Sequence, residues 1–355
     1  RAGPAKDSDM KPTLAHGALA ALLRQLASAE RKQVPAHEVV HILVRDSAYQ
    51  PAAEALTQFA TALQTTGASA TAMRGAPEVF GHAAASALTI AEARGQQAAV
   101  LDLLADDYEH LADAQLRLRS VLAWPATLAV LLGVLLVFVS IFVLPGFREL
   151  YESVGGEVPV TTGWVFAFAR PDRPWMWIVL GVLLAAVAAL IFGWLPRGLR
   201  VWAADALARA PFASGYYDLR LAHRLARAWA VCGQDAELRR AFDAHLGVTT
   251  DPPRNAAVLG ALETAAAQGQ GLAEACAAQP RLPEPVGLYV VLAERLHDWP
   301  ATMAQLAGIA AREERAALAR FERGLVLSSY AVLGVGVWIT LTLVYLPIFR
   351  IGAVL

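Results

Sequence analysis

The sequence predicts an all-α membrane protein with three transmembrane helices and two duplicated cytoplasmic helical-bundle domains. Three observations predict this class: three long runs without a charged residue, apolar residues at helical spacing between them, and a repeat with an offset of 202 residues. Hydrophobic residues make up 56% of the 355-residue chain and charged residues only 17%, whereas an average soluble protein is about 45–50% apolar. Concentration of these apolar residues in long uncharged runs is typical of a protein that crosses a membrane.

The three uncharged runs are each long enough to cross a bilayer. A hydrocarbon core about 30 Å thick needs about 20 helical residues, whereas globular helices average ~11–12 residues and are rarely apolar on every face. The sequence therefore predicts transmembrane helices at Val121–Leu144, Trp175–Leu195 and Leu325–Phe349. Pro125 would cost little in the first turn of such a helix and would kink it further inside, and the sequence leaves both positions open.

Arginine residues beside the runs predict the orientation of the chain, because positively charged residues collect on the cytoplasmic side. If the chain alternates, six of these arginines fall on one side: Arg117, Arg119, Arg197, Arg200, Arg320 and Arg323. We therefore expect residues 1–120 and 196–324 to form cytoplasmic domains. The loop 145–174 and the tail 350–355 are expected on the opposite side of the membrane.

The two cytoplasmic segments have the pattern of helical bundles. Apolar residues recur at helical spacing within Ala98–Leu118, His223–Leu246 and Ala301–Phe321. Strand patterns are almost absent, since the nearest one, Val39–Val44, lies in a helical context. Each segment, at about 110–125 residues, has the size of one domain. Glycines mark the turns: Gly67, Gly75, Gly81, Gly269 and Gly271.

The repeat relates the first run to the third. The pentapeptide LPGFR at Leu144–Arg148 recurs as LPIFR at Leu346–Arg350, and Glu92 corresponds to Glu294 at the same offset. Each repeat is thus a helical domain followed by a transmembrane helix. Because two transmembrane runs separate the domains, both domains face the same compartment. The recurring motif positions are Leu144, Pro145, Phe147, Leu346, Pro347 and Phe349.

These features resemble the type II secretion system protein F / type IV pilus PilC family of inner-membrane platform proteins. Two positions of the second repeat depart from the family pattern: Leu327–Ser328 replaces a Glu-Pro pair, and His297 stands where a glycine is expected. The chain therefore resembles a divergent member. The resemblance extends over most of the chain and rests on Leu23–Ala27, Val34–Pro35, Glu38, Glu92, Gly95, Leu104–Ala105, Ala123–Ala126, Leu144–Phe147, Gly155–Pro159 and Tyr345–Phe349.

The resemblance implies a bacterial inner-membrane protein with a cytoplasmic N-terminus and a periplasmic C-terminus. Family members are thought to couple a cytoplasmic secretion or pilus assembly ATPase to the extraction and addition of pilin or pseudopilin subunits. The implied partners are this ATPase, the transmembrane helices of pilins or pseudopilins, other inner-membrane assembly components, the lipid bilayer and further copies of the chain in a homo-oligomer. The resemblance implies no catalytic residue and no cofactor.

A second hypothesis starts from the segment His37–His41, which reads HEVVH. On a helix, His37 and His41 lie one turn apart and could bind Zn²⁺, with Glu38 as the general base of a membrane-anchored metalloprotease. Such a zinc site requires a third ligand, and only Glu54 lies at a plausible helical distance. The family pattern expects only the glutamate of this segment, so the sequence favours an ordinary helix.

Other candidate residues have two explanations each. Glu92 and Glu294 could contact the ATPase or the other domain, and a helix cap or an internal ion pair explains them equally well. Glycines within the runs could mark close contacts between membrane helices or could simply be tolerated there. These glycines are Gly133, Gly181, Gly334 and Gly336.

The sequence argues against several other functions. No ionisable residue lies inside the three runs, where a central charge costs about 2.5–3.5 kcal/mol and would mark the ion path of a transporter. Cys232 and Cys276 have neither a zinc-ligand nor a disulfide pattern. The sequence contains no GxxxxGK[ST] loop for phosphate, and the net charge of −1 gives no field for nucleic acid. The missing phosphate loop argues against an intrinsic ATPase, and the resemblance to the platform family implies a protein that is not an enzyme.

Overall fold

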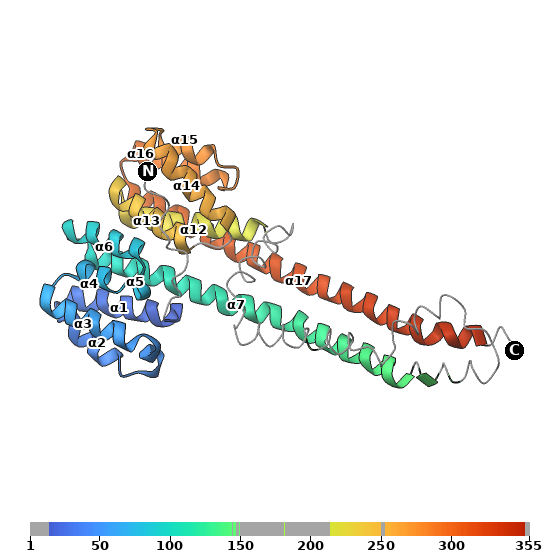
Figure 1. The fold of residues 1–355 in the computed structure, drawn as a ribbon. Coiled ribbons are helices and arrows are strands. Elements are labelled where there is room, and N and C mark those ends of the chain that lie inside the picture. The colour runs from blue at the N-terminus through green and yellow to red at the C-terminus, as the bar shows by residue number, and fades with distance from the viewer. Residues whose placement is uncertain are drawn as a thin grey trace. The chain divides into compact units, whose positions relative to one another are not determined.

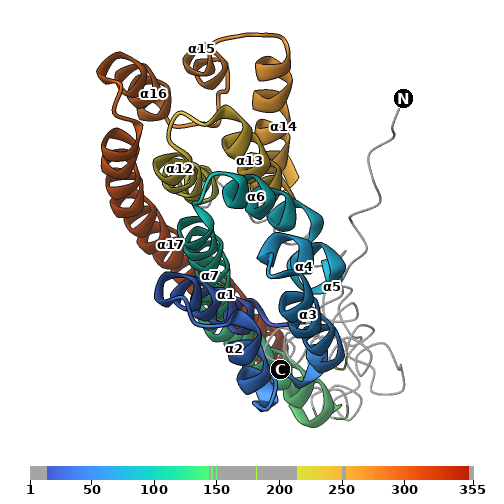
Figure 2. The same ribbon diagram turned by 90° about the vertical axis from the view of Figure 1, so that its left-hand side faces the viewer.

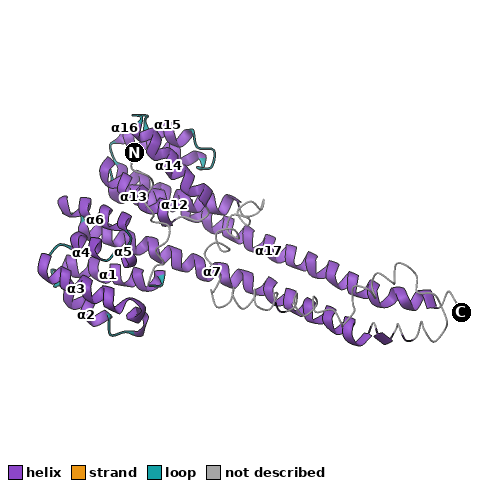
Figure 3. Ribbon diagram, in the orientation of Figure 1, coloured by secondary structure: helices purple, strands orange, loops and turns teal. Residues whose placement is uncertain are grey.

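The fold is described from a computed structural model, which describes residues 14–143, 214–249 and 253–351 and the positions 145, 146, 149 and 181. These residues form helices and loops without a strand (Figure 3), which confirms the predicted all-α class. The apolar stretch from Val39 belongs to helix α2, Ala36–Leu43. The chain divides into two compact units, one of residues 1–116 and 201–319 and one of residues 117–200 and 320–355.

The first compact unit begins with a series of mostly short helices. In α1, the buried residues Leu19, Leu22 and Leu26 share one face because they recur every three to four positions. α1 contacts α2, α2 contacts α3, and α3 contacts α4. The helices of this series are α1 His16–Lys32, α2 Ala36–Leu43, the 3₁₀ helix η2 Ser47–Ala52, α3 Ala53–Thr66, α4 Ser69–Gly75, α5 Pro77–Phe80 and α6 His82–Ala93.

A second series of helices completes the first unit. The predicted segment His223–Leu246 is helical but is divided between two helices. Gly233 follows the first of them with φ of +60°, a left-handed conformation that favours glycine and ends a helix. Asp235 then caps the next helix by accepting hydrogen bonds from Glu237 N and Leu238 N at 3.0 and 3.1 Å. The helices are α12 Ser214–Cys232, α13 Ala236–Thr249, α14 Pro253–Ala267, α15 Leu272–Ala277 and α16 Glu284–Leu296.

The two series pack side by side within this unit. Helix α6 lies against α13, and the contacts continue from α13 to α14, α15 and α16 (Figures 1 and 2). Helices α2 and α16 lie at opposite ends of this stack. One apolar core runs through both series and includes Phe59, Phe80, Trp229 and Phe242. Each large apolar side chain buried in this way contributes about 1.5–3 kcal/mol, so the core is the main source of stability.

Two helices are much longer than the others. Helix α7 runs from Gln97 to Phe138 and is followed by a π-helical turn, η3 Val139–Val143, whereas α17 is Trp299–Ile351 (Figure 1). Each joins a predicted cytoplasmic helix to a predicted transmembrane run without a break. The starts of α7 and α17 are 202 residues apart, as are the starts of α6 and α16.

Two candidate membrane helices are found among the described residues, Ala123–Val143 and Trp299–Thr342, on the basis of length and composition. Most of their side chains are not buried, as expected for helices that face lipid. The first agrees with the predicted run 121–144, and the second contains the beginning of the predicted run 325–349. The predicted run 175–195 lies outside the described residues, apart from Gly181, as does most of the loop 145–174.

The position of Pro125 is now defined. Because α7 begins at Gln97, Pro125 lies in the helix interior and not in a first turn. Proline there removes one backbone hydrogen bond of the helix and crowds the preceding turn. The structure therefore selects the second of the two positions that the sequence leaves open.

Within the second unit, α7 and α17 approach each other closely at Gly336. A Cβ atom added to Gly336 would overlap the side chain of Leu132, whereas one added to Gly334 would meet nothing within 4 Å. Glycine at position 336 therefore permits the close approach of the two helices. Next to this contact, a groove of about 240 Å³ is lined by residues that include Pro125, Leu128, Leu132, Ser328, Ser329 and Val332.

Candidate functional site

Charged side chains of the first unit collect along one face of α7. Asp102, Asp106 and Glu109 recur at helical spacing and therefore lie on one side of the helix. Asp102 pairs with Arg31, while Arg24 pairs with Asp106 at 2.7 Å and also with Glu109. These ion pairs connect α1 to α7. Because the side chains are partly exposed, each pair contributes only about 0–1 kcal/mol.

The same part of α7 is connected to the second helical series. Arg227 of α12 pairs with Asp106, so one carboxylate bridges α1, α7 and α12. One turn earlier in α12, the Nδ1 atom of His223 lies 2.7 Å from Glu314 Oε2 of α17. Helix α12 therefore makes ion pairs with both of the long helices.

Asp107 is the centre of a buried polar network. Arg224 Nε and Nη2 donate to Asp107 Oδ1 and Oδ2 at 2.7 and 2.9 Å, and His245 Nε2 of α13 lies 3.2 Å from Oδ2. Arg224 also donates to Thr249 Oγ1 at 2.6 Å. Asp107, Arg224 and His245 are each at most 6% exposed. The network therefore links α7, α12 and α13 in the interior of the unit.

The charge of Asp107 depends on these two partners. Burial alone would raise the pKa of Asp107, but the Arg224 guanidinium and the His245 ring hold the pKa of this carboxyl well below its usual range. The carboxylate is consequently charged at neutral pH, with hydrogen bonds at both oxygens. Loss of Asp107 would take from Arg224 and His245 the buried carboxylate that they share, and breaking a buried pair in this way is strongly destabilising. The network therefore fixes the register of α7 against α12.

Asp243 of α13 is a partly buried carboxyl, and its pKa shifts in the opposite direction. Trp229 Nε1 donates to Asp243 Oδ1 at 3.0 Å. Burial raises the pKa of Asp243 to about 7, although the Trp229 hydrogen bond and Arg239 lower it in part. The thiols of Cys232 and Cys276 are also buried, and burial raises the pKa of each to about 12. Both thiols are therefore protonated and unreactive at neutral pH.

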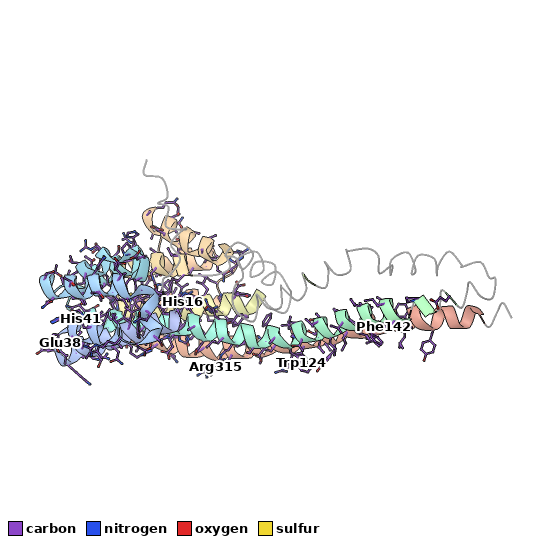
Figure 4. The ribbon with its side chains drawn as sticks, turned by 60° about the horizontal axis from the view of Figure 1, so that its bottom comes forward. His16, Glu38, His41, Trp124, Phe142 and Arg315 are labelled. Atoms are coloured by element: carbon purple, nitrogen blue, oxygen red, sulfur yellow. The ribbon has the colours of Figure 1, made fainter. Side chains whose placement is uncertain are left out.

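The HEVVH segment lies on α2 at the surface of the first unit. His37 is half-buried, whereas Glu38 and His41 are exposed (Figure 4). Glu54, the proposed third ligand, is exposed on α3. Among the described residues, no group of three or more His, Cys, Asp or Glu side chains could hold a metal ion. The structure thus brings no third ligand to the two histidines.

The two repeat-related glutamates have different surroundings. Glu92 Oε1 accepts a hydrogen bond from Ala70 N at 2.7 Å, at the start of α4, where Ala68 has no side-chain acceptor. Glu92 therefore caps α4. Glu294 is exposed on α16 and makes no hydrogen bond or ion pair with the residues that the structure describes.

The LPxFR motif is described only in part. Leu144 and Phe147 lie outside the described residues, and Pro145 lies at one of the isolated described positions. In the second copy of the motif, Leu346, Pro347 and Phe349 all belong to α17. The structure therefore locates the second copy in a helix, near the C-terminal end of α17.

The sequence contains one sign of the Asp107 network. Asp107 stands at helical spacing with the apolar residues Val100, Leu104 and Leu111, and a charged residue on an apolar side of a helix is expected to need partners. Arg224 lies 117 residues from Asp107 along the chain. Because no spacing rule connects helices so far apart, the partners could be identified only from the structure.

Comparison with known proteins gives two matches. Residues 22–145, which extend from α1 through α7 and η3, match the family model described as type II secretion system (T2SS), protein F. The chain is also similar to the type IV pilus assembly protein TapC of Aeromonas hydrophila, with 22% identity over 176 residues. That alignment covers 50% of this chain and 43% of TapC, so it spans less than half the length of the relative. Together with the all-helical fold, these matches support the resemblance of the chain to the type II secretion system protein F / type IV pilus PilC family.

Proposed function

We propose that the chain is an inner-membrane platform protein of a type II secretion system or a type IV pilus-like machine, and not an enzyme. In this role it couples a cytoplasmic assembly ATPase to the addition of pilin or pseudopilin subunits. The observation that carries the proposal is α7, a single helix that begins in the first compact unit and continues into the candidate membrane helix Ala123–Val143. All of α7 lies within the range that matches the protein F family.

The ion-paired face of α7 supports the coupling role. An α-helix is stiff along its axis because every turn is closed by backbone hydrogen bonds. A displacement of α12 is passed to α7 through Arg224 and Asp107, since separation of the two would break two buried, charge-assisted hydrogen bonds. The ATPase would therefore act on the first unit, and α7 would carry the movement into the membrane.

The second unit supports a contact with pilin-like helices. Its groove beside Pro125 and Ser329 is mostly apolar, and the Ser329 hydroxyl already donates to the Leu325 carbonyl at 2.6 Å. Apolar side chains around it are exposed, among them Leu131 and Val332. An apolar transmembrane helix of a pilin or pseudopilin fits such a surface, and other inner-membrane assembly components would bind elsewhere on the membrane helices.

We further propose that the chain is a duplication with three transmembrane helices. The duplication is supported by pairs of helices whose first residues are 202 positions apart. Gly67 and Gly269, which are also 202 positions apart, both follow a helix with positive φ, of +68° and +76°. In this arrangement residues 1–120 and 196–324 are cytoplasmic domains. The loop 145–174 and the C-terminus are periplasmic.

The coupling role is tested by a break in α7 where the two units meet along the chain. Leu116→Gly together with Arg117→Gly interrupts the helix at two exposed residues, and glycine costs about 1 kcal/mol per position relative to alanine. We expect the full-length double variant to co-purify with the assembly ATPase and to lose secretion or pilus assembly.

The matched control is Leu116→Ala together with Arg117→Ala, which removes the same side chains and keeps the helix. This control should retain assembly. If the glycine pair assembles as well as the alanine pair, force does not pass through α7. If the wild-type chain does not co-purify with a secretion or pilus ATPase, the platform role itself is wrong.

A further inference from the structure

One face of α16 carries leucine residues that no helix of the described chain covers. Leu288, Leu292 and Leu296 recur every four residues and therefore line one side of α16. Their exposed fractions are 66%, 39% and 61%. The other side of α16 is buried in the core through Val286 and Val290. A surface helix normally shows polar residues on its outer side, so this leucine face is a candidate contact surface.

The helix at the same place in the first series shows how such a face is covered. Residues of α6 that lie 202 positions before Tyr289, Leu292 and Leu296 are Ala87, Ile90 and Arg94, whereas the counterpart of Leu288 is Ser86, which is exposed. Ala87, Ile90 and Arg94 share one side of α6 by their spacing. Ala87 is fully buried, and Ile90 is partly buried against the core.

Helix α13 covers that side of α6. The two helices are in contact, and Arg94 pairs with Asp235 and, at 3.1 Å, with Glu237 at the start of α13. The corresponding side of α16 has no such helix among the described residues of its own chain. The helix expected to cover this side of α16 is therefore one that corresponds to α13.

Helix α2 is the counterpart of α13 in the first series. Val40 and Phe242, 202 residues apart, are both buried in the core. On the side of α13 that carries Glu237, the next residues at helical spacing are Ala241 and Ala244, and their counterparts in α2 are Val39 and Ile42. Ile42 is 67% exposed. Among the residues that the structure describes, no helix therefore covers this apolar side of α2 in the way that α6 covers α13.

We propose that α16 of one copy packs against α2 of the next copy, and so repeats between chains the contact that α6 makes with α13 within a chain. The polarity of the two surfaces agrees with this: the residues that correspond to the ion pair Arg94–Glu237 are Leu296 and Pro35, both apolar. Because α2 and α16 lie at opposite ends of the helix stack (Figure 2), one chain can make both contacts at once.

The proposed contact joins two different surfaces, so it adds copies head to tail and produces a closed ring or an open row. It does not depend on the platform role, because it follows from the faces of the helices alone. It differs from a two-fold contact, in which α16 would meet α16 of the partner. This difference makes the contact testable by cross-linking.

The first test uses two full-length chains with different affinity tags, expressed together and treated in membranes with a short bismaleimide. One carries Ile42→Cys and the other Leu292→Cys. We expect a cross-linked dimer that holds both tags and none when either variant is expressed alone. The wild-type chain is the background control, because Cys232 and Cys276 are buried. Val248→Cys, at a 57% exposed residue of α13, is the matched control and should not cross-link to Ile42→Cys.

The second test rebuilds the ion pair of the intrachain contact. Leu296→Arg should weaken self-association of the detergent-solubilised chain about tenfold or more, as loss of a central apolar contact does. Pro35→Glu in the same chain should restore self-association, because the introduced guanidinium and carboxylate would form an ion pair like that of Arg94 and Glu237. Circular dichroism should show that both variants keep their helical content.

Three results would overturn the proposal. Leu292→Cys that cross-links to itself would mean a two-fold contact. Leu296→Arg that releases the ATPase and leaves self-association unchanged would assign the leucine face to the ATPase. If Pro35→Glu fails to restore self-association of a folded Leu296→Arg variant, α2 and α16 are not in contact between copies. Loss of secretion in chains that still self-associate would concern the platform role and leave this contact intact.

Discussion

Asp107 is buried and Asp243 is partly buried, and the surroundings of the two carboxyls give them opposite effects on stability. Asp107 has a guanidinium at both oxygens, and its pKa is held well below the usual range. Asp243 has one hydrogen bond from Trp229, and burial raises its pKa to about 7. The charge of Asp107 therefore stabilises the fold at neutral pH, whereas ionisation of Asp243 weakens it.

Asp107→Ala should lower the free energy of unfolding by about 3–5 kcal/mol at pH 7, because Arg224 and His245 lose the buried carboxylate that they share. The folded pKa of Asp107 lies below its ordinary value of 3.8, so its contribution is present above about pH 4 and is lost as the pH falls further. Denaturant unfolding of the full chain in detergent measures the effect. A loss at pH 7 of the size expected for an exposed pair, under 1 kcal/mol, would contradict the buried network.

Asp243→Asn should stabilise the protein at pH 8 by about 2–4 kcal/mol, since each pKa unit corresponds to ~1.4 kcal/mol. The folded pKa is raised, so the unfolded chain ionises first and stability falls as the pH rises from about 4 to 7. The asparagine oxygen can still accept the Trp229 hydrogen bond. The gain should nearly vanish at pH 4, and thermal unfolding at both pH values measures it. An equal gain at both would show that charge is not the cause.

At the scale of the element, the ends of several helices can be predicted from glycines in the sequence. Gly67, Gly233 and Gly269 end or follow helices with positive φ, as punctuation by glycine predicts. The helical period also predicts most of α7 and α17. It does not predict the division of His223–Leu246, because Gly233 interrupts an apolar period that continues on both sides. The helical period also does not show that α7 begins at Gln97, and this start places Pro125 in the interior of the helix.

His297 ends α16 in the left-handed region, with φ of +55°, where Gly95 ends α6 with φ of +68°. A side chain in this conformation is strained by about 1–2 kcal/mol, and glycine would remove that strain. Glycine also makes the unfolded chain more flexible, which offsets part of the stabilisation. His297→Gly should therefore raise the free energy of unfolding by about 0.5–1 kcal/mol. Gly95→Ala is the reciprocal change and should lower it by a similar amount. Stabilisation by both changes would contradict this account.

Gly336→Ala should push α7 and α17 apart in the second unit, because the new methyl would overlap Leu132. Overpacking of this kind costs about 1–3 kcal/mol, and resistance to unfolding in detergent should fall accordingly. Gly334→Ala is the matched control, since open space surrounds that position. Leu132→Ala added to Gly336→Ala should recover part of the loss. Equal effects at positions 334 and 336 would mean that the helices do not meet there.

At the scale of the whole molecule, composition and uncharged runs are enough to predict an all-helical membrane protein, because length and hydropathy decide whether a helix can cross a bilayer. The Asp107 network is not predictable in this way. Arg224 and His245 come from two helices of another part of the chain, and their guanidinium and imidazole groups meet Asp107 only through the packing of the first unit. Local patterns contain no information on such packing.

The orientation of the chain can be tested with a thiol reagent that does not cross membranes. Leu116→Cys should react only after the cells are opened, because its domain is proposed to be cytoplasmic. Glu149→Cys should react in intact cells whose outer membrane has been made permeable, because the loop 145–174 is proposed to be periplasmic. The buried native thiols keep the background low. The reverse pattern of labelling would invert the topology.

The partners Asp107 and Arg224 are 117 residues apart, and the candidate membrane helix Ala123–Val143 lies between them. A ribosome that has completed α7 has therefore not yet made the cation that neutralises the carboxylate. The contacts of Asp107 with Arg224 and His245 can therefore form only after α12 and α13 have been synthesised. A gene fragment that stops at residue 116 would encode Asp107 without either of the two groups that hold its charge in the folded chain.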